Sequence, residues 1–181
     1  RTITPSTTSE RAPMTVSQRI AWYSILAMVF LVPVAMSNWT WLPGVTLPLS
    51  FDQFDIIKVF LQRFFTLIAF GAWAWHILVE GGRIRRTKVD YVILALLGWI
   101  LITTLTSIHP PTAIFGKYRR FEGLLSFINY AAVFWLVVQF VDRASRVRAV
   151  AKAIFFSGVI VNGYGLLQYL SLDPVPWGNL P

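Results

Sequence analysis

The chain has 181 residues, of which 56% are hydrophobic, 15% aromatic and only 13% charged, and its mean hydropathy is +0.61. These values exclude an ordinary soluble domain and predict an all-α fold, a polytopic bundle of transmembrane helices. The formal charge of +8 does not indicate nucleic-acid binding, because the cations flank the apolar runs, where they set topology and contact anionic headgroups. The lack of cysteine excludes disulfides, thiolate metal sites and a cysteine nucleophile.

Residues 1–18 are predicted to form a disordered cytoplasmic tail, because the stretch is rich in Ser, Thr and Pro and its first 16 residues have no apolar periodicity. The chain begins with Arg1 and stops in the loop-like stretch "DPVPWGNLP". We therefore expect a fragment of a longer protein, in which residues 19–181 form the membrane bundle.

Five spanning helices are predicted in this bundle, each long enough for a hydrocarbon core about 30 Å thick. They cover about residues 19–37, 55–79, 91–107, 123–141 and 149–170. The first also has the charged, apolar and small-residue regions of a signal peptide. A retained helix is favoured, because the apolar run is long and Trp39 and Trp41 after it are typical of an interfacial belt.

The cations predict the orientation of the bundle. Eleven of the 16 Lys and Arg residues lie on one side of the predicted membrane, three lie on the other, and two lie inside the second span. Because cytoplasmic loops carry the excess of Lys and Arg, the N-terminus is predicted to be cytoplasmic. The eleven are Arg1, Arg11, Arg19, Arg83, Arg85, Arg86, Lys88, Arg143, Arg146, Arg148 and Lys152.

The three external cations are an exception to this rule, and they occur together in "GKYRRFEG". Lys117, Arg119 and Arg120 come just before the fourth span, whose first free N–H groups favour anions. A phosphate or pyrophosphate fits, because the planar fork of arginine can hold two of its oxygens. In the alternative interpretation the segment is an interfacial anchor whose cations touch lipid phosphates nonspecifically.

Other residues of this segment, and two from the second span, complete the predicted pyrophosphate site. Glu122 can favour the helix N-terminus or orient an arginine, and Gly116 and Gly123 permit a close backbone approach. Lys58 and Arg63 lie in the outer half of the second span, where an ionisable residue is expected to face the bundle or a water-filled cavity. The alternative is that Lys58 pairs with Asp55 and that Arg63 extends outward to the interface.

Two histidines are weaker candidates. Ala72 and His76 have the A-x-x-x-H spacing of antenna helices that bind bacteriochlorophyll, so His76 is a possible pigment ligand, although an interfacial polar role is more typical. His109 is interpreted as a loop residue rather than a proton-transfer group. In the fifth span, Ser157, Gly158, Gly163 and Gly165 predict close helix packing, with Asn162 and Gln168 as interhelical hydrogen-bonding groups. No metal or cofactor motif is present in the sequence.

The passage "TSIHPPTAIFGKYRRFEGLLSFINYAAVFWLV" resembles the O-antigen ligase and polymerase family of bacterial multi-pass membrane proteins. In that family a Ser and a His or Asp-Pro loop precede a Gly and an R-[YF]-E-G-L motif that opens the next span. Here the motif runs from Arg120 to Leu124. The ending "GYGLLQYLSLDPVPWGNLP" also resembles members that continue into another external loop. The resemblance covers roughly residues 19–181, which would be the N-terminal part of a protein of 10–12 helices.

This resemblance implies a metal-independent ligase without a cofactor, in the bacterial cytoplasmic membrane. Such a protein takes glycan from an undecaprenyl-pyrophosphate carrier at the periplasmic face and joins it to lipid A-core, another glycan repeat or a protein side chain. Arg120 would then help to bind the pyrophosphate. The later spans and a large periplasmic loop with an essential arginine and histidine are lacking here, so this segment is not expected to catalyse alone. Two alternatives stay open: an accessory subunit of a larger, pigment-associated complex, and a transporter of lipid-linked glycan.

Overall fold

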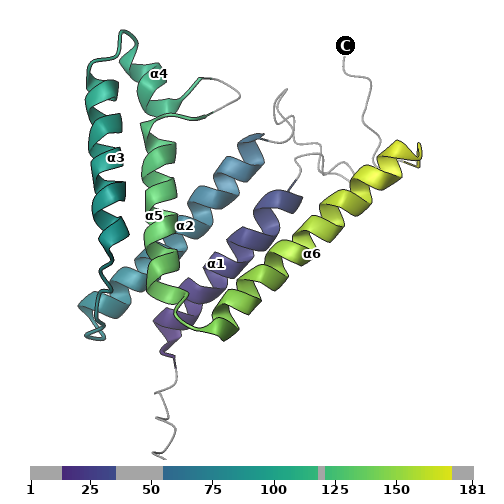
Figure 1. Cartoon of the computed structure of the whole chain (residues 1–181), viewed down its shortest axis with the longest axis horizontal. Coiled ribbons are helices and arrows are strands. Elements are labelled where there is room, and N and C mark those ends of the chain that lie inside the picture. The colour runs from purple at the N-terminus through teal and green to yellow at the C-terminus, as the bar shows by residue number, and fades with distance from the viewer. Residues whose placement is uncertain (1–13, 36–54, 118–120, 173–181) are drawn as a thin grey trace, which may run out of the picture.

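The computed structural model describes residues 14–35, 55–117 and 121–172, and every regular element in these ranges is helical (Figure 1). The prediction of an all-α membrane bundle is confirmed. The six helices are α1 (Val16–Val34), α2 (Asp55–Leu78), α3 (Lys88–Leu105), α4 (Pro110–Phe115), α5 (Leu124–Phe140) and α6 (Ala144–Tyr169).

Among the described helices, α1, α2, α3 and α6 are long and apolar enough to cross a membrane. The fourth predicted span, residues 123–141, corresponds to α5, which is equally apolar but has only 17 residues. At a rise of about 1.5 Å per residue, α5 is about 26 Å long. The protein is therefore a multi-pass membrane protein in which α5 is the shortest of the long helices.

Helix α1 supplies most of the small buried core. Ala21 and Ile25 are almost fully buried, and they cluster with Ala69 of α2 and with Leu136 and Phe140 of α5. Helix α1 packs along α2 and also against α6. Helix α1 is thus a central element of the bundle, and its retention in place of a removable signal peptide stays a prediction.

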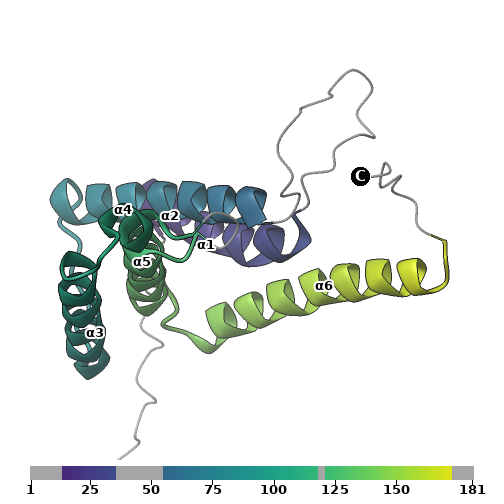
Figure 2. The ribbon, with the colours of Figure 1, turned by 90° about the horizontal axis from the view of Figure 1, so that it is seen from above.

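The bundle has two parts that differ in inclination. Helices α1, α2 and α6 are slanted in Figure 1, whereas α3 and α5 stand more upright and pack against each other. Seen from above, α3 and α6 lie at opposite ends of the molecule (Figure 2). Both helices carry many exposed large apolar side chains. Such surfaces are unfavourable in water and are expected where lipid or further transmembrane helices cover them.

Three helices begin earlier than the sequence analysis predicts. Helix α1 begins at Val16, because Thr15 and Gln18 form a reciprocal capping box in which each side chain bonds the other's backbone N–H. The predicted tail, residues 1–18, is thus too long at its C-terminal end, and residues 1–13 lie outside the described ranges. Helix α3 begins at Lys88 rather than near residue 91, and α6 begins at Ala144 rather than near residue 149.

Helix α6 does not show the predicted close packing at its three glycines, although Ser157, the fourth residue of that prediction, is buried. A Cβ atom added at Gly158, Gly163 or Gly165 would meet no atom within 4 Å. The Asn162 amide donates to the Gly158 carbonyl and the Gln168 amide to the Tyr164 hydroxyl, so both of these bonds stay within the helix. Within the described part of the chain, the glycine-containing face of α6 is therefore open.

Candidate functional site

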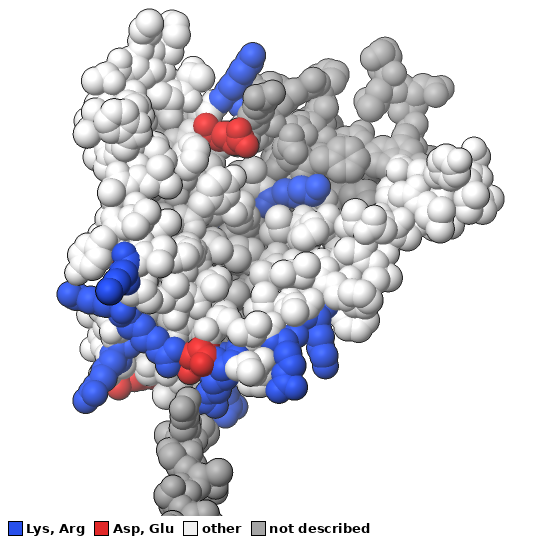
Figure 3. All heavy atoms as spheres, in the orientation of Figure 1, with Lys and Arg blue, Asp and Glu red and all other residues white. Residues whose placement is uncertain are grey.

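Most of the described cations gather at one end of the bundle. This basic end consists of the start of α1, the α2–α3 connection and the α5–α6 connection, which lie together at the bottom of Figure 1. Figure 3 shows a band of Lys and Arg there and only isolated basic side chains higher on the same face. The opposite, loop end carries α4 and the described residues 116–117 and 121–123. The three segments that the sequence analysis assigned to one side of the membrane therefore lie together.

The predicted pyrophosphate site falls at the loop end, and the structure describes only part of it. Lys117 and Glu122 are exposed, and Gly123 is buried as the N-cap residue of α5. Arg119 and Arg120 lie outside the described residues. His109 is the N-cap residue of the short helix α4, which the sequence analysis interpreted as loop.

Two glycines hold the base of this loop together. Gly116 has a φ of 88°, a left-handed conformation that favours glycine, and its backbone contacts the backbone of Phe121 and Glu122. Gly123 lies directly against the backbone of Gly116 and Ile114. The predicted close backbone approach is thus present, but it joins the two ends of the loop to each other.

Arg63 connects α2 to the same loop. Its guanidinium donates a hydrogen bond of 3.1 Å to the Ser126 hydroxyl in the first turn of α5, and Ser126 donates to the Phe121 carbonyl. Phe121 has a φ of 51°, which a bulky residue rarely adopts unless its surroundings hold it there. Arg63 therefore faces the bundle, as predicted, and does not extend outward to the interface.

An open groove of about 400 Å³ lies beside Arg63. Its walls are apolar residues of α2, and Phe121 closes one side: the lining comprises Ile56, Val59, Phe60, Arg63, Phe64, Leu67 and Phe121. Lys58, the other cation of α2, is half-buried one and a half turns before Arg63 and does not line the groove. Arg63 contacts the loop segment, through its hydrogen bond to Ser126 and beside Phe121 in the groove.

At the basic end, a polar cluster joins the first turn of α1 to the end of α2. The Ser17 hydroxyl donates a 2.7 Å hydrogen bond to the Glu80 carboxylate, which also lies 2.7 Å from Nδ1 of His76. Hydrogen bonds from the Thr15, His76 and Ser17 side chains lower the pKa of Glu80 from 4.5 to about 2. Glu80 is therefore held as a carboxylate that ties α2 to α1.

Both ring nitrogens of His76 are engaged in this cluster. Nε2 lies 2.9 Å from the Gln18 amide nitrogen, while Nδ1 faces Glu80. Since the carboxylate can only accept, Nδ1 is the donor and Nε2 accepts from Gln18. A pigment that used His76 as its axial ligand would have to displace one of these two partners. The geometry describes an interfacial polar residue, the alternative that the sequence analysis regarded as more typical.

Asp142 organises the cations of the α5–α6 connection. Its carboxylate accepts hydrogen bonds of 3.0 Å from Arg85 and 2.9 Å from Arg146, and Arg143 lies 3.6 Å away. Burial raises the pKa of Asp142, but the hydrogen bond from Arg85 and the charges of Arg146 and Arg85 outweigh it, so the pKa lies below 3.8. At neutral pH Asp142 is therefore an anion among cations.

The sequence analysis missed both carboxylates. Glu80 lies four residues after His76 and Asp142 four residues before Arg146, a spacing that brings side chains together at the end of α2 and the start of α6. These two spacings can be read from the local sequence. The partners Ser17 and Arg85 lie 63 and 57 residues away, and no local pattern predicts them. In the described ranges no group of three His, Asp or Glu side chains lies together as a metal site.

The helix lengths, the apolar outer surface and the polar ends define a multi-pass helical membrane protein. Comparison with known protein families, with curated proteins and with solved structures finds no match for the chain. Its function is accordingly argued from the residues at the loop end.

Proposed function

We propose that the chain is the N-terminal part of an O-antigen ligase-like protein of the bacterial cytoplasmic membrane. It handles undecaprenyl-pyrophosphate-linked glycan at the periplasmic face, and the loop end is that face. The proposal rests on the likeness of residues 120–124 to the family motif and on the three cations there, which are an exception to the charge bias of the other loops.

One structural observation carries the proposal: the hydrogen bond from Arg63 to Ser126 holds a membrane-embedded cation against the segment that contains the motif. A charge within a span is costly, and such residues usually face a functional site or a polar partner. Here the partner belongs to the first turn of α5, directly after the motif. Arg63 thereby adds a fixed positive charge to the loop that carries Lys117, Arg119 and Arg120.

The proposed chemistry is transfer of the glycan from the carrier pyrophosphate to an acceptor hydroxyl or amide. The bond between the anomeric carbon and the pyrophosphate oxygen breaks, and its electron pair leaves on that oxygen. Lys117, Arg119 and Arg120, together with Arg63 and Lys58, bind the pyrophosphate and stabilise the leaving charge, while the acceptor oxygen or nitrogen forms the new bond to the anomeric carbon. The acceptor's proton leaves to a base that this segment does not supply.

The test compares the variants Arg63→Ala and Arg120→Ala of the full-length protein with Arg148→Gln. Arg148 is an exposed cation at the basic end whose guanidinium donates only to a carbonyl of its own helix. A charge-assisted hydrogen bond is worth about 1.5–3 kcal/mol, so each loop-end variant should lose about tenfold or more in carrier retention and glycan transfer. The control should lose neither.

Unchanged retention and transfer in both loop-end variants would contradict the proposal. Arginine-dependent movement of the carrier across the membrane, without glycan transfer, would replace the ligase by a transporter. Assays of carrier flipping and of glycan transfer on the same reconstituted protein distinguish these results.

A further inference from the structure

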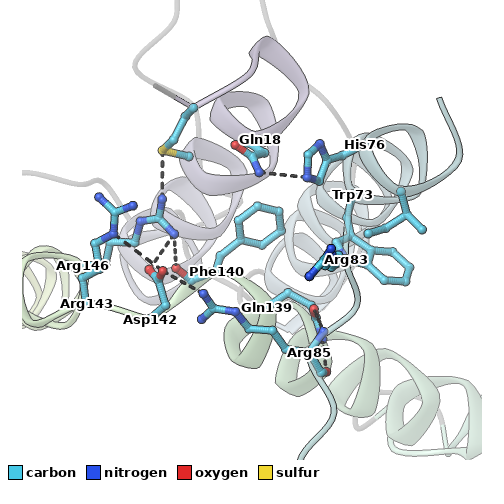
Figure 4. A pocket seen from close by; sticks show the side chains of 12 residues that line it. Gln18, Trp73, His76, Arg83, Arg85, Gln139, Phe140, Asp142, Arg143 and Arg146 are labelled. Atoms are coloured by element: carbon cyan, nitrogen blue, oxygen red, sulfur yellow. Dashed lines mark hydrogen bonds and ion pairs between the residues drawn. The ribbon is translucent and has the colours of Figure 1, made fainter. Parts of the chain in front are cut away.

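The basic end contains a cavity of about 310 Å³ between the end of α2, the α2–α3 connection and the α5–α6 connection (Figure 4). Four arginines border it, Arg83, Arg85, Arg143 and Arg146, together with the single carboxylate of Asp142. Trp73 and Phe140 form apolar parts of its wall. The cavity lies at the opposite end of the bundle from the proposed pyrophosphate site.

The charges in this cavity do not balance. Asp142 is engaged by Arg85 and Arg146, which leaves three positive charges in excess among the charged lining residues. Arg143 approaches the carboxylate only to 3.6 Å. Arg83 makes no hydrogen bond or ion pair with the rest of the described chain, and Figure 4 shows its guanidinium directed toward the cavity. Like charges brought together in a partly enclosed space favour an anion.

The walls that carry these charges are fixed by other contacts. Arg146 donates to the Phe140 carbonyl at 2.6 Å and lies 5.5 Å from the centre of the Trp22 ring. The backbone of Arg85 exchanges two hydrogen bonds with the Gln139 amide, of 2.9 and 2.8 Å. A ligand would therefore meet two cations, Arg85 and Arg146, that are already positioned, which reduces the entropy lost on binding.

We infer that this cavity is a binding site for a phosphate group, held by Arg83 and Arg143 beside the Asp142–Arg85–Arg146 cluster. The guanidinium fork matches two phosphate oxygens, and the two less engaged arginines provide two such forks. The cavity lies where the spans end, at the depth of the lipid headgroups, and basic pockets between helices at this depth bind phospholipid headgroups. The phosphate comes from an anionic phospholipid or from the aqueous phase.

The experiment uses the full chain in phosphatidylcholine nanodiscs that contain cardiolipin, and native mass spectrometry measures the cardiolipin retained. The cavity variant is Arg83→Gln/Arg143→Gln. The matched control, Arg148→Gln/Lys152→Gln, removes two exposed cations from the same end that do not line the cavity. We expect the cavity variant to retain at least about tenfold less cardiolipin than the control, a loss equal to about 1.4 kcal/mol.

A second arm measures binding of inorganic phosphate to the same proteins in nanodiscs of phosphatidylcholine alone. Phosphate binding that depends on Arg83 and Arg143, without selective cardiolipin retention, would identify the aqueous phase as the source. Equal cardiolipin retention by the cavity variant and the control, together with phosphate binding that the cavity variant does not change, would overturn the inference. Because Arg83 has no partner in the described chain, the single variant Arg83→Gln tests the site with an unchanged Asp142 cluster.

Discussion

Arg63 and Ser126 join α2 to α5 through a hydrogen bond of 3.1 Å, although 63 residues separate them in the chain. The same serine hydroxyl donates to the Phe121 carbonyl. One buried side chain thus fixes both the membrane-embedded arginine and the last turn of the loop before α5. This relationship ties Arg63 and Phe121 to the first turn of α5.

Replacing Ser126 by Ala should therefore destabilise the bundle and loosen the loop. The variant removes the acceptor of Arg63, and a hydrogen bond of this half-buried cation contributes about 1 kcal/mol or more to stability. Thermal unfolding in detergent micelles measures the loss. Ser145→Ala is the matched control, because Ser145 is exposed at the start of α6; equal stability of both variants would contradict the role of the hydrogen bond.

The α1–α2 contact should weaken at acidic pH through Glu80. Its pKa is about 2 in the folded protein against an ordinary 4.5, so the carboxylate stabilises the fold fully above about pH 4.5 and loses this effect as the pH falls toward 2. Unfolding midpoints of the unmodified protein and of Glu80→Gln should differ at pH 6 and converge near pH 2. Glu122→Gln, an exposed carboxylate at the other end, should show no such convergence. A gap between wild type and Glu80→Gln that did not change with pH would count against this assignment.

Replacing Asp142 by Asn should destabilise the basic end by about 2 kcal/mol, because hydrogen bonds to charged groups contribute about 1.5–3 kcal/mol and the arginines would be left to repel one another. Since the pKa of Asp142 is lowered, the stabilisation is present above about pH 3.8 and is lost as the pH falls below it. Urea unfolding at pH 7 and at pH 3 measures both effects. A loss at pH 3 as large as at pH 7 would show that charge is not the cause.

Two glycine substitutions should have opposite effects on stability. Gly116→Ala places a Cβ against the Phe121 and Glu122 backbone at a φ of 88°, and left-handed backbone alone costs a residue with a side chain about 1–2 kcal/mol. Gly98→Ala lies within α3, where the new Cβ meets nothing within 4 Å, and should stabilise the helix by about 0.5–1 kcal/mol. Thermal unfolding of both variants checks the sign of each effect.

The sequence predicts the long helices well and their ends less well. Helix α2 begins at the predicted Asp55 and ends one residue early, because its apolar run is bounded by polar residues on both sides. The start of α6 was missed because Arg146 and Arg148 were interpreted as loop cations. In the structure Arg146 turns back toward Asp142 and the Phe140 carbonyl, so a charged residue occupies the first turns of the helix. Helix α4 was missed although Pro110 and Pro111 are typical of a first helical turn.

The sequence predicts the candidate site only where a charged residue lies in an unusual position, such as a cation within a membrane span. Arg63 was unusual as a cation within a span, and this led correctly to the expectation that it faces the bundle. Its partner Ser126 gave no such signal, since a serine at a helix start is common. The same holds for Ser17 and Glu80, whose pairing depends on how α1 and α2 lie together. These contacts could not be predicted from the sequence, because they depend on tertiary pairing between polar residues that have no distinctive local pattern.

The shortness of α5 has a consequence for the surrounding membrane. With an apolar length of about 26 Å beside a hydrocarbon core about 30 Å thick, α5 produces a hydrophobic mismatch of about 4 Å. A bilayer meets such a helix by thinning locally, and each ångström costs a fraction of a kcal/mol. Headgroups next to α5 would then lie deeper than elsewhere around the protein. The protein thus shapes the lipid around it as well as residing in it.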